Sequence, residues 1–169
     1  HRYTLFPYTT LFRSDLRLAE ERPVNPAFIF AVLLWPVLTI RQQQLQHDEG
    51  LPPIAALHQA AHEVLGEQVR ITAIPRRFST IVIEIWELQW RLPRRTPAAV
   101  AKLIAHPRFR AGYDFLLLRE QAGEALDGLG QWWSSYQIAD EAERTALVAT
   151  VTAPKSRRRS RVRRRKSRD

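Results

Sequence analysis

Two pairs of arginines stand where helices are predicted to begin: Arg76 with Arg77, and Arg108 with Arg110. The first pair comes just ahead of a helix expected to open near Ser79 or Thr80, and the second lies in the first turn of a later helix. An arginine does little for helix stability there, because the N-terminus is already the positive end of the helix dipole. Free backbone N–H groups and guanidinium groups together suit an anion. As a set these arginines indicate phosphate contacts, although each one alone is also compatible with an ion pair to Asp114 or another surface carboxylate.

A basic tract closes the chain and carries its net charge. Residues 154–169 contain ten Lys or Arg and one Asp, whereas the preceding 153 residues carry equal numbers of basic and acidic side chains. Since the tract has almost nothing apolar to bury, it is predicted to be a disordered tail. Such a tail would bind phosphates through the release of counterions. A solubilising extension and a membrane-surface tether are the alternatives.

The sequence offers no combination of residues that predicts catalysis or a metal site. His58 and His62 are four residues apart and could face one metal ion, but Gln59 stands where a zinc-protease helix needs glutamate, and no third ligand suggests itself. Surface or interfacial histidines are the preferred interpretation. The chain has no cysteine, which excludes thiolate metal sites and disulfides and suits a reducing cytoplasm.

The elements that must position the arginines are predicted to be helices, six or seven of them in one all-α domain covering residues 15–153. Four apolar residues fall on one face of the central helix: Ile81, Ile85, Leu88 and Leu92. Their spacing outweighs the preference of the β-branched run at 81–83 for a strand. In the preceding helix, expected from Ile54 to about Arg70, the inward residues are predicted to be Ile54, Leu57, Ala61, Val64 and Leu65.

Helix-start and helix-end signals fix the remaining elements. The first helix is predicted to start at Asn25-Pro26 and to end at Gly50, and Thr96-Pro97 opens a short helix from Ala98 to Ala105. His106-Pro107 then ends that helix and begins the next. The last two helices are expected around Trp132-Trp133 and from Ala142 to Val151, the latter behind a capping box of Asp140 and Glu143.

Two apolar features favour core packing over more specialised roles. The segment from Pro23 to Ile40 has no charge for 18 residues, which is the lower limit for a membrane span, but it contains Pro36 and two further prolines. A buried core helix is therefore predicted. Trp132 and Trp133 could stack on unpaired bases, yet adjacent tryptophans on a short helix more often attach that helix to the core.

The first 14 residues are set aside from the fold. His1 to Ser14 resembles a peptide translated from sequencing-adapter DNA, and the alternative is an ordinary disordered N-terminus. The chain also has no methionine, and so no initiator residue, which suggests an incomplete reading frame.

Several motifs occur together in an order that resembles the C-terminal region of bacterial poly(A) polymerases. They are I-P-R-R-F at 74–78, I-W-E-L-Q at 85–89, H-P-R-F-R-A-G-Y-D-F-L-L-L-R at 106–119, Q-W-W at 131–133 and the closing arginine tract. The resemblance runs from about Pro23 to the end of the chain. It implies a helical, RNA-binding part of an ATP-dependent enzyme that adds adenylates to RNA 3′ ends without a template.

With RNA implied as the ligand, the basic residues are predicted to contact the backbone of a single strand. In the folded domain they are expected to be Arg76, Arg77, Arg91, Arg94, Arg95, Arg108 and Arg110. In the tail they are expected to be Lys155, Arg157, Arg158, Arg159, Arg161, Arg163, Arg164, Arg165 and Lys166.

The catalytic signature of such polymerases is absent from this sequence. Their nucleotidyltransferase domain carries a Gly-Ser pair followed by two aspartates one residue apart, which hold the magnesium ions, and neither pattern occurs here. ATP and Mg²⁺ are thus implied for a missing N-terminal domain, no cofactor is expected in this fragment, and the fragment is expected to be inactive alone. Its expected partners are single-stranded RNA, that catalytic domain and proteins of RNA decay, in the cytoplasm and away from membranes.

Two other functions remain open from the sequence. One is a basic helical adaptor that binds protein partners in RNA metabolism, with RNA contact incidental. The weaker one is a membrane-associated helix anchored through residues 23–40.

Overall fold

The computed structural model describes residues 25–72 and 75–152, and this part of the chain folds into seven α-helices without a strand. The helices are α2 Pro26–Asp48, α3 Pro53–Thr72, α4 Arg76–Arg91, α5 Pro97–Ile104, α6 Phe109–Gln121, α7 Leu129–Ile138 and α8 Glu141–Thr152. The all-α prediction is confirmed. The segments predicted to be artefactual (1–14) and to be a disordered tail (154–169) lie outside the described residues.

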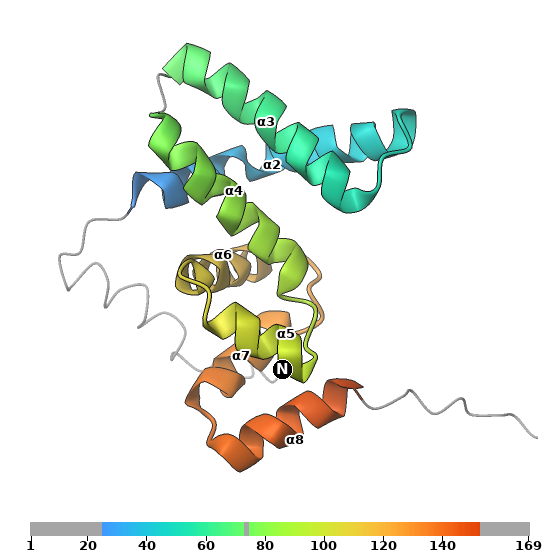
Figure 1. The fold of residues 1–169 in the computed structure, drawn as a ribbon, viewed down its shortest axis with the longest axis vertical. Helices are drawn as coiled ribbons and strands as arrows, with labels where there is room; N and C mark the ends of the chain where they lie inside the picture. Colours follow the sequence, from blue (N-terminus) through green and yellow to red (C-terminus); the bar gives the residue numbers. More distant parts are fainter. Residues whose placement is uncertain (1–24, 73–74, 153–169) are drawn as a thin grey trace, which may run out of the picture.

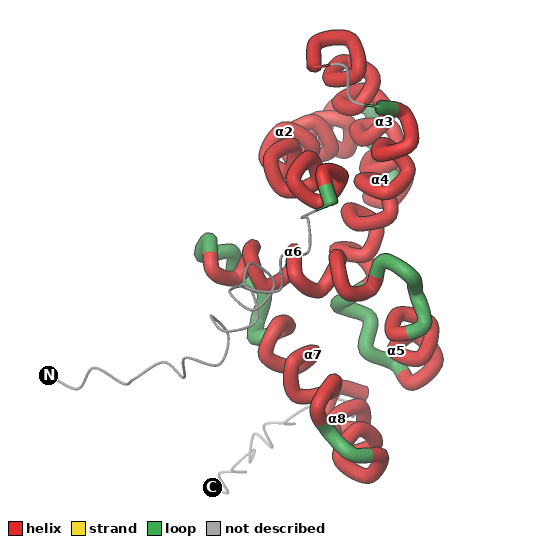
Figure 2. The backbone as a smooth tube through the Cα atoms, turned by 90° about the vertical axis from the view of Figure 1, so that its left-hand side faces the viewer, coloured by secondary structure: helices red, strands yellow, loops and turns green. Residues whose placement is uncertain are grey.

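Helix α4 joins two groups of helices (Figure 1). One group contains α2 and α3, which lie along the first half of α4, and the other contains α5, α6, α7 and α8 (Figures 1 and 2). The core also has two clusters. Val82 and Trp86 belong to the one shared with α2 and α3, which Phe115 of α6 joins, whereas Leu88 and Leu92 belong to the one shared with α5 to α8. A single helix therefore contributes its apolar face to both clusters.

The predicted caps are confirmed at three helix starts. The Asn25 side chain accepts a hydrogen bond from the Ala27 N–H at 3.0 Å, and the Thr96 hydroxyl accepts one from the Ala99 N–H at 3.4 Å. Asp140 and Glu143 form the reciprocal capping box: the Glu143 N–H donates to the Asp140 carboxylate at 2.9 Å and the Asp140 N–H donates to the Glu143 carboxylate at 3.0 Å. These side chains satisfy backbone donors that a helix leaves free at its N-terminus.

Two sequence predictions about α3 and α4 were wrong in detail. Helix α4 begins at Arg76 and not near Ser79 or Thr80, so Arg76 and Arg77 belong to its first turn. Ile54, predicted to point inward, is 44% exposed. It lies in the first turn of α3, and because side chains lean toward the N-terminus of their helix, Ile54 extends past the end of the packed interface. The other four inward predictions for α3 are confirmed, because Leu57, Ala61, Val64 and Leu65 are buried.

Helix α2 is a core helix on one face only. Ala27, Ala31, Leu38 and Leu45 are fully buried against α3 and α4. Within the described residues, α2 is the one helix whose length and composition would allow it to cross a membrane. Core helices of water-soluble proteins also meet that criterion, and 22% of this apolar window is buried inside the structure, where α2 packs against α3 and α4.

Candidate nucleic-acid interface

The C-terminal end of α3 and the first turns of α4 form the walls of an open groove of about 400 Å³. Arg70 from α3 and Arg76 from α4 both line it, together with the hydroxyl-bearing residues Ser79 and Thr80. Arg77 is exposed beside it, with its guanidinium carbon 5.0 Å from the centre of the Phe78 ring. Three arginines are thus gathered at one end of the molecule.

The start of α4 has no internal group that neutralises these cations. Its N-cap is Pro75, which makes no side-chain hydrogen bond to the helix, and its first turn has no acidic residue. Across residues 25–72 and 75–152, no carboxylate lies within ion-pair distance of Arg70, Arg76 or Arg77. Because backbone N–H groups and guanidinium groups here lack anionic partners, this end of α4 is suited to phosphate oxygens.

The arginines at the start of α6 have carboxylate partners. Arg108 Nε donates to Glu84 Oε2 at 3.1 Å. Arg110 Nε lies 2.9 Å from Asp114 Oδ1, one turn further along α6. Both pairs are partly exposed, so each adds little to stability. The pairing with Asp114 is the alternative that the sequence left open for these residues.

The remaining predicted arginines lie at the C-terminal end of α4 and in the loop after it. Arg91 is exposed and 3.6 Å from Glu87, four residues earlier on the helix. Arg94 is exposed in the loop. Arg95 is half-buried with its guanidinium carbon 5.3 Å from the centre of the Trp132 ring, and its buried Nε has no hydrogen-bond partner among the described residues.

Helix α4 connects most of these positions. Arg77, Glu84 and Arg91 are spaced by seven residues, so they fall along one side of the helix. Arg108 joins this row through Glu84. Sixteen helical residues extend about 24 Å, so Arg77 and Arg91 lie near opposite ends of α4 and the predicted residues do not share one pocket.

Arg70 was not among the predicted residues, and the structure places it in the same groove as Arg76. The two residues are only six positions apart, on either side of the short connection between α3 and α4. A short helix–helix connection brings the end of one helix near the start of the next. A start of α4 near Ser79 or Thr80 would lengthen that connection, so only the observed start at Arg76 brings Arg70 into the group.

The tryptophans of α7 belong to the core, as predicted. Trp133 is fully buried and its Nε1 donates to the Leu92 carbonyl at 3.1 Å. Trp132 is 9% exposed and packs edge-on against Trp133, with 4.9 Å between ring centres. Trp133 thus attaches α7 to the end of α4, while Trp132 Nε1 donates to the Leu147 carbonyl of α8 at 3.4 Å. Both rings are buried, so neither presents an open face to an unpaired base.

The two histidines of α3 do not form a metal cluster within the described residues. His58 Nε2 lies 3.4 Å from Glu87 Oε1 of α4, while His62 borders the arginine groove. In the described part of the chain, no group of three or more His, Cys, Asp or Glu is placed to hold a metal ion.

The fold and this surface define an all-helical domain with arginines along its central helix. Residues 49–167 match the model of the family described as "Polymerase A arginine-rich C-terminus", which covers α3 to α8 and the basic tract. The chain belongs to this family.

Individual relatives agree with that assignment. Poly(A) polymerase I of Salmonella typhi is 39% identical over 160 residues, covering 92% of this chain and 34% of the relative. Poly(A) polymerase I of Escherichia coli O6:H1 is 36% identical over 154 residues, covering 89% and 33%. That of Haemophilus influenzae is 37% identical over 142 residues, covering 83% and 31%. The chain therefore spans about a third of the length of the curated relatives it matches.

Proposed function

We propose that this domain binds single-stranded RNA beside a nucleotidyltransferase domain, as the C-terminal part of a cytoplasmic poly(A) polymerase. The whole enzyme would add adenylates from ATP to RNA 3′ ends. ATP and Mg²⁺ would be held by the nucleotidyltransferase domain, and the domain described here would be inactive by itself. Proteins of RNA decay are further proposed partners.

One observation carries the proposal: Arg70 and Arg76 line one groove at the open start of α4, Arg77 is exposed at the next position, and no carboxylate among the described residues lies within ion-pair distance of the three. A surface built only for solubility would intersperse charges of both signs, as α4 itself does further along with Glu84 and Glu87. Uncompensated guanidinium groups beside free helix N–H groups favour a ligand that carries several negative oxygens. The RNA backbone is such a ligand.

The other predicted contacts would extend the path of the RNA from this end. Arg77 and Arg91 lie on the same side of α4, so a strand that starts at Arg76 can follow the helix toward Arg94 and Arg95. Arg108 and Arg110 would join only by exchanging their carboxylate partners for phosphate. The basic tail would raise the encounter rate with RNA and supply sequence-independent affinity.

Binding of a fluorescent oligoadenylate tests the proposal. Replacing both Arg76 and Arg77 with Gln should weaken binding about thirtyfold, because two lost charged hydrogen bonds at about 1 kcal/mol each total about 2 kcal/mol. If both arginines contact single-stranded RNA, the slope of log affinity against log salt should become shallower by about 1.4.

A matched variant controls for the change in net charge. Lys102 on α5 and Arg144 on α8 lie outside the predicted set, and replacing both with Gln removes the same two charges. This variant should stay within about twofold of the original affinity. An equal loss of RNA affinity in both double variants would show that only net charge matters, and it would reject the assigned interface.

A further inference from the structure

Helix α2 leaves a row of large apolar side chains in solvent: Ile29, Leu33, Val37 and Ile40. They recur every three or four residues, so they share one face of the helix. Their exposed fractions are 45, 66, 51 and 58%, respectively. The opposite face packs against α3 and α4. A helix that is apolar on all sides is normally covered on all sides, and here no described residue covers this row, which we name the α2 stripe.

The chemistry of the α2 stripe is that of an interface core. From Asn25 to Ile40 there is no charged residue, and the first one, Arg41, turns to α3 and bonds Glu63. Protein interfaces are depleted of charge at their centres, whereas ordinary solvent-facing helix surfaces carry charged residues. The stripe therefore matches another protein surface better than it matches water.

A lipid bilayer fits this helix less well than a protein does. To cross a bilayer, α2 would have to carry the α3 carboxylates Glu63 and Glu67 into hydrocarbon, because α3 packs along it. A helix that lies on a membrane surface typically carries lysine or arginine on its polar face. Residues 25–40 contain neither.

The match to longer relatives indicates which protein surface would cover the α2 stripe. The arginine-rich family module begins at residue 49, directly after α2, and its description places it at the C-terminus of the polymerase. The Salmonella typhi match covers 92% of this chain. The uncovered 8% amounts to fewer residues than the 23 of α2, so the match must include at least part of that helix. Helix α2 is thus shared with the relatives but lies outside the module, and two-thirds of the relative's length is unmatched.

We propose that the α2 stripe is the docking surface for the polypeptide that precedes the arginine-rich module in the longer relatives. The inner face of α2 is fixed to α4, where Trp86 Nε1 donates to the Ala31 carbonyl at 2.9 Å. Docking on the outer face would therefore set the orientation of α4 and its arginines relative to the rest of the enzyme. The inference rests on the exposure of α2 and on family membership, and it does not require RNA binding.

Thiol labelling tests this proposal directly because the chain contains no cysteine. Leu33→Cys places a thiol in the middle of the stripe, and Ile71→Cys places one at a similarly exposed position on α3, 68% against 66%. Each variant is labelled in the chain alone and in a fusion that carries, ahead of Asn25, the part of the Salmonella typhi relative that this chain does not match. Mass spectrometry of the α2 and α3 peptides reports each rate.

The expected result is that labelling at position 33 is about tenfold slower or more in the fusion, since a covered site reacts only when the interface opens. Labelling at position 71 should be unchanged. Equal rates at position 33 in the two proteins would overturn the proposal, and so would equal slowing at both positions, which indicates general shielding.

Two further measurements examine other occupants of the stripe. Sedimentation of the chain alone, compared with Leu33→Glu, detects a second copy, and flotation with phosphatidylcholine–phosphatidylglycerol vesicles detects lipid. Monomers that do not float support the proposal. A dimer or vesicle binding that Leu33→Glu abolishes, with helix content unchanged, would assign the stripe to that occupant and overturn the proposal. RNA affinity enters none of these readouts, so the proposed function is tested separately.

Discussion

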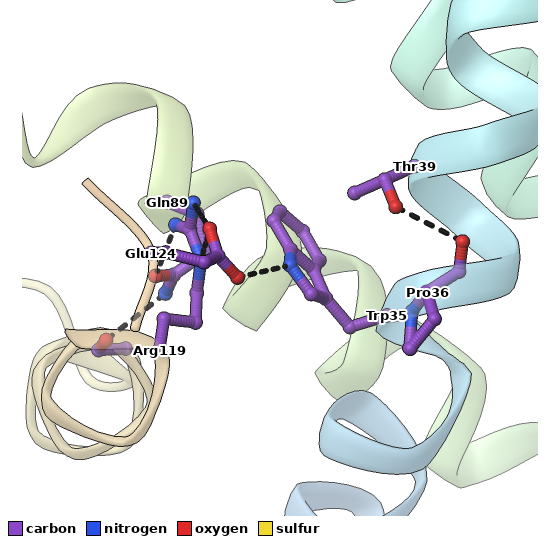
Figure 3. A network of polar contacts seen from close by, with 7 residues as sticks. Trp35, Pro36, Thr39, Gln89, Arg119 and Glu124 are labelled. Carbon is purple, nitrogen blue, oxygen red and sulfur yellow. Dashed lines mark hydrogen bonds and ion pairs between the residues drawn. The ribbon is translucent and has the colours of Figure 1, made fainter. Parts of the chain in front are cut away.

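The guanidinium carbon of Arg119 lies 4.5 Å from the centre of the Trp35 ring, and both side chains donate hydrogen bonds to the carboxylate of Glu124 (Figure 3). Arg119 also donates to Gln89 Oε1 at 3.1 Å. Trp35 belongs to α2, Gln89 to α4 and Arg119 to α6, while Glu124 follows α6. Side chains from three helices and the segment after α6 thus connect the two groups of helices at the level of α4.

This network predicts a pH dependence of stability. Burial by itself raises the pKa of Glu124, but hydrogen bonds and charge from Arg119 outweigh it and hold the pKa below its usual value of 4.5. A carboxyl with a lowered pKa in the folded state stabilises the fold above its unfolded pKa, and this contribution is lost as the pH falls from 4.5 through the folded pKa. Urea unfolding of the original chain should therefore show a loss of stability in this acidic range.

Glu124→Gln isolates the contribution of that one group. The variant should be less stable than the original chain at neutral pH, and the difference should shrink as the pH falls below 4.5, where the original carboxyl becomes neutral as well. A difference that stays constant between about pH 7 and about pH 3 would show that the charge of Glu124 contributes nothing.

The close crossing of α4 and α6 predicts opposite effects for two glycine substitutions. A Cβ at Gly112 would lie 2.9 Å from Leu88 Cβ and 2.7 Å from its Cδ1, so Gly112→Ala must push the two helices apart. We expect a cost of roughly 1–3 kcal/mol in the free energy of unfolding. Gly66→Ala in α3 meets nothing within 4 Å and should stabilise by about 0.5–1 kcal/mol. Chemical denaturation of both variants measures the change in unfolding free energy. Equal changes in the two variants would contradict the close approach of α4 and α6 at Gly112.

A buried hydrogen bond predicts the importance of Trp133. Trp133→Phe leaves a cavity and removes the donor to the Leu92 carbonyl, so it should cost roughly 2–4 kcal/mol of unfolding free energy. Trp90→Phe changes a tryptophan that is 36% exposed and should cost about 0.5 kcal/mol or less. Comparable losses in the two variants, by thermal or urea unfolding, would mean that Trp133 does not fix α7 to α4.

The pairing of Arg108 predicts that it contributes less to RNA binding than Arg76. Replacing Arg108 and Glu84 together with Gln removes a surface ion pair without changing the net charge. Oligoadenylate affinity should stay within about twofold and stability within about 1 kcal/mol, because exposed ion pairs contribute little. A loss of affinity as large as that of the Arg76 and Arg77 double variant would show that Arg108 leaves Glu84 to bind phosphate.

Local signals in the sequence determined the helices and the membership of the core. Proline, asparagine and threonine at predicted starts, and the capping box of Asp140 and Glu143, act within a few residues, so they can be read without the fold. The same holds for the apolar spacing of Ile85, Leu88 and Leu92. Ile54 was predicted wrongly because periodicity gives the direction of a side chain but not whether a neighbouring helix extends far enough to cover it.

Tertiary structure decided which arginines have partners. Arg76, Arg77, Arg108 and Arg110 are alike in sequence, each near a helix start, yet the fold brings Glu84 from α4 to Arg108 and leaves the Arg76 end without a carboxylate among the described residues. Only the packing of α3 against α4 adds Arg70 to that end. Charge pairing depends on distances of a few ångströms between separate helices, whereas a helix start depends on neighbours along the chain. The sequence therefore located the arginines but could not show which of them have carboxylate partners.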